Sequence, residues 1–173
     1  MKRGLVNLDL IKDKKLKETL IFLAKLVLLS IPLYIVIWFN ISFAFAQDFL
    51  AYHIFHFLIF FNIQVSRDGF NLIFQNFSII INKDCIGWKG ILFFFALVLS
   101  TKSTWKKRFI GLFIGIPAVF SVNILRIVFM IWVGFNIPNT FSIFHDILWQ
   151  GSMIFLVLLL WLIWWKATYL INQ

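Results

Sequence analysis

The fold of this chain is decided by residues 109–135, which read FIGLFIGIPAVFSVNILRIVFMIWVGF. Within this run only Ser121, Asn123 and Arg126 carry a hydroxyl, amide or charged group. A helix of this length and composition can cross the hydrocarbon core of a bilayer, which is about 30 Å thick. The run therefore predicts a membrane-spanning helix with one charge near one of its ends.

The composition of the whole chain supports the same class of protein. Of its 173 residues, 62% are hydrophobic and 13% are charged, whereas a soluble domain has about 25% charged residues. This balance excludes a soluble globular domain and a disordered chain. We expect an all-α integral membrane protein, with residues 1–173 forming a single polytopic domain.

Three more apolar runs lie outward from the first, at residues 20–46, 88–100 and 147–165. Together the four runs predict four transmembrane helices. Residues 88–100 are short for a crossing, so we expect this helix to begin upstream of Trp88. A cleaved signal peptide is not expected, because the basic leader and first apolar run are longer than those of signal peptides.

The distribution of basic residues predicts the orientation. Twelve of the sixteen Lys and Arg residues fall in a leader at residues 1–25, in the loop 101–108, or just after the last span. By the positive-inside rule these three segments are cytoplasmic. The remaining four, which Asp48, Asp68, Asp84 and Asp146 balance, are Arg67, Lys83, Lys89 and Arg126. The net charge of +9 thus indicates topology and not binding of nucleic acid.

Residues 49–63 are apolar but too short to cross, and a crossing there would place the basic loop 101–108 outside. We expect a re-entrant or interfacial helix. Residues 70–74 and 77–81 favour strands and are bounded by turn signals at 67–69 and 75–76. They predict a small external β-hairpin within residues 64–84.

Three chemically unusual residues fall at one predicted level. At 1.5 Å per helical residue, Arg126 lies about 27 Å from the inner end of its span, Cys85 about 24 Å and His145 about 31 Å. A thiolate attacks carbonyls, a His transfers protons at neutral pH, and an Arg stabilises a thiolate or oxyanion. The trio allows acyl transfer at the outer interface.

Each of the three residues also has a simpler interpretation. Cys85 could be an inert, buried small hydrophobe. Arg126 could extend to outer lipid head groups, and His145 could begin the last helix with Asp146 as its cap. No span holds paired carboxylates, and no Gly-Lys-Ser/Thr loop exists, which disfavours an aspartyl protease and a nucleotide hydrolase.

Other features carry weaker signals. His53 and His56 are three residues apart and could ligate a metal or haem, but we favour interfacial histidines, with no metal or cofactor. The Gly111 and Gly115 pair predicts close helix packing. Gly87, and Gly90 beyond Trp88, could let a backbone or a substrate approach Cys85.

Three blocks resemble, in order and topology, the signature blocks of the exosortase/archaeosortase family. They are DCIGWKG at residues 84–90, NILRI at 123–127 and FHD at 144–146. The archaeosortase branch is more similar, through the Gly-Trp-Lys that follows the Cys. The resemblance covers residues 82–165 and implies a membrane cysteine transpeptidase, although this chain is shorter than many members.

The resemblance also implies roles for individual residues and partners. Cys85 would be the nucleophile, Arg126 the stabiliser of thiolate and oxyanion, and His145 the general acid and base. Supporting positions in the same blocks are Asp84, Gly87, Trp88, Asn123 and Asp146. Substrates would be secreted proteins ending in a motif, a transmembrane helix and a basic tail. Cleavage would occur on the extracytoplasmic face of the cell membrane, and an amine, on a lipid head group, would resolve a thioester.

Two rival functions use the same residues differently. The chain could be a small transporter or a non-enzymatic, lipid-binding membrane subunit in which Arg126 binds an anionic lipid or solute. It could also be a haem or metal protein that uses His53, His56 and His145. Replacement of Cys85 tests the first rival, and an absorption spectrum tests the second.

Overall fold

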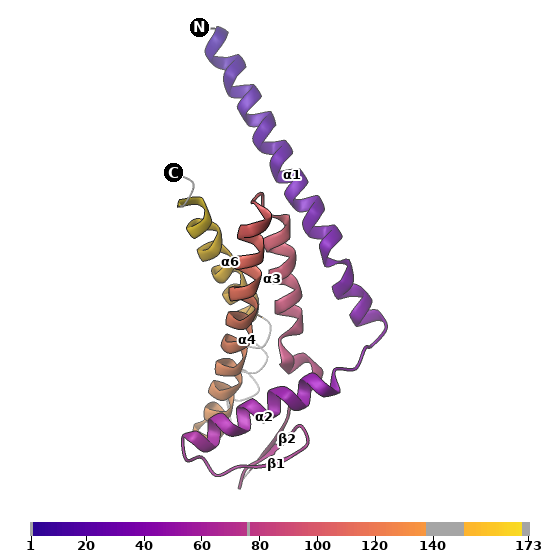
Figure 1. The fold of residues 1–173 in the computed structure, drawn as a ribbon, viewed down its shortest axis with the longest axis vertical. Coiled ribbons are helices and arrows are strands. Elements are labelled where there is room, and N and C mark those ends of the chain that lie inside the picture. Colours follow the sequence, from indigo (N-terminus) through magenta and orange to yellow (C-terminus); the bar gives the residue numbers. More distant parts are fainter. Residues whose placement is uncertain (1, 76, 138–150, 171–173) are drawn as a thin grey trace.

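The structure is a computed structural model that describes residues 2–75, 77–137 and 151–170 (Figure 1). Its helices are α1 (Lys2–Trp38), α2 (Ala44–Phe60), α3 (Trp88–Ser100), α4 (Trp105–Asn136) and α6 (Met153–Leu170), with a 3-10 turn, η1 (Lys83–Ile86). Helices α3, α4 and α6 pack against one another, α1 leans against α3, and α2 lies across one end of this bundle.

The opposite end of the bundle, which we call the basic end, holds the connection between α3 and α4 and the end of α6 (Figure 1). Lys102 Nζ lies 3.0 Å from a carboxylate oxygen of Glu18 on α1, and Lys107 Nζ donates to the carbonyl of Thr168 on α6 at 2.9 Å. The indole N–H of Trp161 donates to the hydroxyl of Thr101 at 2.9 Å. The basic loop, α1 and α6 thus meet at one end, as the charge pattern predicts.

Within the described residues, two helical segments are long and apolar enough to cross a membrane: Lys14–Trp38 of α1 and Trp105–Asn136 of α4. The described chain is thus mostly helical with two candidate membrane spans, and the expected four transmembrane helices are not confirmed. Helix α3 has 13 residues, or about 20 Å, which is less than the hydrocarbon core. Its expected extension upstream of Trp88 is wrong, because Gly87 takes a left-handed conformation (φ 78°) and η1 precedes it.

The apolar run 20–46 divides into two helices, because α1 ends at Trp38 and α2 begins at Ala44. The expected helix over residues 49–63 exists as α2, with earlier bounds. Its buried face consists of Leu50, Ala51, Ile54 and Leu58. This face packs on η1, α4 and the sheet, so α2 closes the end of the bundle that we call the site end.

The predicted hairpin is a three-stranded antiparallel sheet of β1 (Ser66–Asp68), β2 (Asn71–Ile73) and β3 (Ser78–Ile80). Ser66 pairs with Ile73, and Asn71 pairs with Ile80. The additional strand arises because the turn needs only residues 69 and 70, with Gly69 at φ 56°, so Arg67 and Asp68 stay in β1. Arg67 also pairs with Asp48 of α2 at 3.3 Å, which fixes the sheet to that helix.

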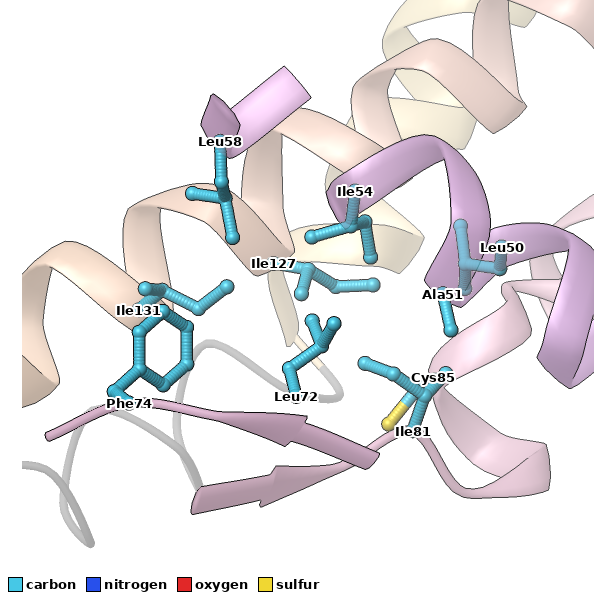
Figure 2. Packing of buried hydrophobic residues seen from close by; sticks show 10 residues of the cluster. All are labelled: Leu50, Ala51, Ile54, Leu58, Leu72, Phe74, Ile81, Cys85, Ile127 and Ile131. Carbon is cyan, nitrogen blue, oxygen red and sulfur yellow. The ribbon is translucent and has the colours of Figure 1, made fainter. Parts of the chain in front are cut away.

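Two apolar clusters hold the bundle together. One joins α2, the sheet and α4 around Leu72 and Ile127, and it contains Cys85 (Figure 2). The other joins α3, α4 and α6 around Phe94 and Val157. The predicted close packing at Gly111 and Gly115 is confirmed, because a Cβ at Gly115 would lie 2.2 Å from the Phe94 ring, and one at Gly111 would lie 2.3 Å from Trp164 Nε1.

Candidate active site

The turn that carries Cys85 is built by an asparagine just before it. Asn82 caps η1, since its Oδ1 accepts the backbone N–H groups of Asp84 at 3.0 Å and of Cys85 at 3.2 Å. Asn is among the strongest N-cap residues, so its position three residues before the Cys was a usable signal. Asn82 was nevertheless not among the predicted site residues.

The thiol of Cys85 is held inside the protein. The residue is 6% exposed, and its Sγ donates to Asn82 Oδ1 at 3.2 Å. Around it lie apolar side chains of α2 and of the sheet region, including Ala51 and Ile81 (Figure 2). The thiol of the predicted nucleophile is therefore shielded from solvent.

Asn123 ties α4 to the same turn. Its side chain is fully buried, and its Nδ2 donates to the backbone carbonyl of Cys85 at 2.7 Å. Gly87 makes this contact possible, because a Cβ there would lie 3.0 Å from Asn123 Cγ and the φ of 78° is strained for other residues. The group that approaches at Gly87 is thus the Asn123 amide.

Arg126 lies three residues after Asn123, on the same buried face of α4, and is 9% exposed. Its charge acts on the Cys85 sulfur. The structure thus brings Cys85, Asn123 and Arg126 together at the site end, at the common level that helix lengths indicate for Cys85 and Arg126. His145 and Asp146 lie outside the described residues.

The protonation state of Cys85 follows from its surroundings. Burial raises the pKa of the thiol to about 11 and outweighs the opposing effects of an Asn82 backbone hydrogen bond and the Arg126 charge. The Asp84 charge raises this pKa further. The Cys85 thiol is therefore neutral at pH 7, and its use as a nucleophile requires a base.

A cavity of about 480 Å³ lies beside this turn. Asp84, Lys89 and Arg126 contribute its charged side chains, and Asp84 and Lys89 pair with each other at 2.8 Å. Its apolar lining comes from α1, α3 and α6 and includes Leu33, Phe93 and Met153. A cavity with apolar walls and a few convergent polar groups is a typical binding site.

Trp88 and Gly90, which follow Cys85 in the sequence, make packing contacts next to the site. Trp88 is buried, with its ring centroid 5.6 Å from that of Phe43 and 5.7 Å from Lys89 Nζ. At Gly90, a Cβ would lie 2.7 Å from Met153 Cε, so this glycine admits a side chain of α6. These contacts fix the start of α3 behind the Cys85 turn.

His53 and His56 lie on α2 among aromatic rings. His53 Nδ1 is 2.8 Å from the carbonyl of Phe49, and the His56 ring centroid lies 4.2 Å from that of Tyr52. Across the part of the chain that the structure describes, no three His, Cys, Asp or Glu residues form a group that could hold a metal ion.

The sequence of the chain matches the model of a family described as transmembrane exosortase, over residues 10–164. The chain belongs to the transmembrane exosortase family. Exosortases are membrane cysteine transpeptidases. The comparisons with curated proteins and with solved structures give no match.

The matched region is longer than the part of the chain that carries the three blocks. It includes residues 84–90, 123–127 and 144–146, and it extends upstream through α1 and α2, beyond the region 82–165 that carries the resemblance. The N-terminal half is therefore part of the exosortase domain. The archaeosortase branch stays a prediction, because the family match does not distinguish branches.

Proposed function

We propose that this exosortase cleaves a C-terminal sorting signal from exported proteins and transfers the cleaved protein to an amine acceptor. The observation that carries the proposal is the convergence of Cys85, Asn123 and Arg126 beside one cavity. Acyl transfer through a thioester needs a nucleophile and a group that stabilises the oxyanion, and Cys85 and Arg126 have these chemistries, with Asn123 holding the turn that carries Cys85.

The first half-reaction forms a thioester. Because the Cys85 thiol is neutral at pH 7, a base must take its proton, and we assign this role to His145. The sulfur then attacks the scissile carbonyl, and Arg126 stabilises first the thiolate and then the oxyanion. When the peptide C–N bond breaks, the proton moves from His145 to the leaving amine.

The second half-reaction releases the product. An amine attacks the thioester carbonyl, loses a proton to His145, and forms an amide with the sorted protein. The Cys85 sulfur leaves as a thiolate and regains its proton. We propose a lipid head group as the source of the amine, in line with the family resemblance.

The cavity suits the substrate segment next to the scissile bond. It combines charged groups near the Cys85 turn with apolar side chains of Leu33, Phe93 and Val157. A sorting signal passes from a polar motif into an apolar helix, so its chemistry changes in the same direction. We propose that this transition segment lies in the cavity.

We further propose that the site end faces outside the cell. The basic residues of loop 101–108 gather at the other end of the bundle, as the positive-inside rule requires for a cytoplasmic end. In a Cys85→Ala background, we expect Thr104→Cys to react only with a membrane-permeable maleimide. Ile80→Cys on β3, which is 60% exposed, should react with an impermeable one, and the reverse pattern would contradict the orientation.

The decisive test of the reaction is Cys85→Ser. As substrate we would use an exported protein encoded beside this chain in the genome that ends in a motif, an apolar helix and basic residues. We expect the variant to insert normally but to lose processing, because a serine hydroxyl gives up its proton to a base much less readily than a cysteine thiol does. Ser66→Ala on β1, outside the site, serves as the control and should process fully. Full processing by Cys85→Ser would favour the non-enzymatic rival.

A further inference from the structure

The cavity is lined by residues on both sides of Cys85 in the sequence, but Cys85 is not among its lining residues. Asp84 and Gly87, which flank Cys85, line the cavity together with Arg126. Cys85 itself belongs to the apolar cluster of α2, α4 and the sheet, and Figure 2 shows its sulfur among these side chains. A substrate in the cavity therefore meets the turn and Arg126 before it meets the sulfur.

The group that holds the sulfur there is the side-chain oxygen of Asn82. This oxygen accepts the backbone N–H groups of Asp84 and Cys85, and only the oxygen of the amide can do so. The orientation of the amide is thereby fixed, with an acceptor facing Cys85 Sγ at 3.2 Å. An acceptor binds an S–H group and repels a thiolate, so the Asn82 side chain favours the protonated form.

We propose that Asn82 is a positioning residue that holds Cys85 in a resting, protonated state directed away from the cavity, and that attack requires the sulfur to leave Asn82 and turn towards Arg126. The inference rests on the proposed function, since it concerns the same nucleophile. It assigns to Asn82 a role beyond capping the turn. Substrate binding in the cavity would then favour release of the sulfur.

The charges around Cys85 are consistent with this two-position behaviour. Asp84 on the same turn is paired with Lys89 of α3, and Arg126 approaches from α4. From α2 and the sheet region the described neighbours in its cluster are apolar, among them Ala51 and Leu72. When the S–H bond breaks, the proton passes to the base that we assign to His145. The thiolate then loses its contact with Asn82 and is drawn to the guanidinium.

Because Cys85 is the only cysteine of the chain, its reactivity can be measured without a substrate. The experiment follows the rate of alkylation by iodoacetamide between pH 6 and 10, using the full chain in detergent micelles. Since burial raises the pKa of the wild-type thiol to about 11, its rate should rise about tenfold per pH unit across this range. The slope reports ionisation, and rate differences that do not depend on pH report access.

Two variants separate positioning from capping. Ser and Asp cap helices about as well as Asn, so both variants should keep the turn, and a residue that only caps should tolerate Ser without a change in alkylation. If Asn82 holds the thiol, Asn82→Ser should react about 3- to 10-fold faster at pH 7, the scale of one neutral hydrogen bond. Asn82→Asp places a carboxylate beside the sulfur and should react about 10-fold slower or more. The backbone N–H of residue 82 is present in every variant.

A matched control is Asn136→Ser, since Asn136 bonds only to Trp132 of its own helix among the contacts described for its side chain. The alkylation rate of Cys85 in this variant should equal that of the wild type. Wild-type rates in both Asn82 variants would overturn the proposal and leave Asn82 as a cap. The expected rates without processing of any sorting-signal substrate would instead overturn the proposed function. Processing by wild type with unchanged alkylation in the variants would overturn the positioning role alone.

Discussion

The two halves of α4 use one buried face in opposite ways. The face runs through Gly111, Gly115, Val119 and Asn123 at intervals of four residues and continues to Arg126. In the half near the basic end, the glycines admit rings of α3 and α6. In the half near the site end, an amide and a guanidinium meet the Cys85 turn. The half near the basic end packs closely because its glycines have no side chain, whereas the half near the site end positions polar groups.

The polar groups of the site-end half do not have the features of a stabilising core, unlike Ile127 and Ile131 beside them. Asn123 is fully buried and donates one hydrogen bond to Cys85, but its Oδ1 has no hydrogen-bond partner among the described residues. A buried polar atom without a partner costs about 1–3 kcal/mol. The comparison therefore predicts that changes in the polar half impair activity more than folding, and that changes in the glycine half do the reverse.

The largest effect is expected for Arg126→Lys. Lys keeps the charge but loses the planar fork that can hold an oxyanion and a second acceptor together. Loss of one oxyanion donor reduces turnover by about 10²-fold or more. Processing of a sorting-signal substrate should fall by this amount, while membrane insertion and thermal unfolding in detergent stay near those of the wild type.

The same variant tests whether the two halves of α4 differ in function. Leu125→Ala, at the neighbouring but 58% exposed position of α4, is the control and should process normally. If Arg126 only extended to lipid head groups, Lys would replace it well. Near-normal turnover in Arg126→Lys would thus remove the functional distinction between the two halves of the helix.

How far the sequence could predict these two halves depends on how local each signal is. The glycine spacing and the level of Arg126 follow from helical geometry within residues 109–135. The level of Cys85 was estimated over residues 85–101 as one helix, although Cys85 lies in η1 before α3 begins. The Asn82 contact depends on the folded turn, in which one oxygen meets Asp84, Cys85 and the thiol. Hydrophobicity could not reveal it.

The errors in the fold have a related physical cause. Apolar runs indicate burial in lipid or protein without saying which. A span was predicted within residues 20–46, and the candidate span Lys14–Trp38 overlaps it, but the end of the run belongs to a second helix that begins at Ala44. Likewise, Arg67 and Asp68 resemble turn residues, but pairing with Leu72 and Asn71 keeps them in a strand.

In the glycine half, Gly115→Ala should have the larger effect on stability. The new Cβ would lie 2.2 Å from two atoms of the Phe94 ring, and Phe94 is 1% exposed, so the ring has little room to move. Overpacking of this kind costs about 1–3 kcal/mol. We expect earlier unfolding in a thermal or denaturant titration in detergent, with turnover per folded molecule unchanged; Ile114→Ala, on the exposed side of α4, is the control.

Gly111→Ala should have the smallest effect, although its Cβ would lie as close to a neighbour, at 2.3 Å from Trp164 Nε1. Trp164 is only partly buried and can move outward, which costs mainly its hydrogen bond to the Lys107 carbonyl at 3.2 Å. One such bond contributes about 0.5–1.5 kcal/mol, and Ala favours a helix over Gly by about 1 kcal/mol. The two terms nearly cancel, so unfolding should shift by less than about 1 kcal/mol in the same titration. A loss as large as that of Gly115→Ala would mean that Trp164 is as firmly fixed as Phe94, and that the basic end is packed as rigidly as the centre of the bundle.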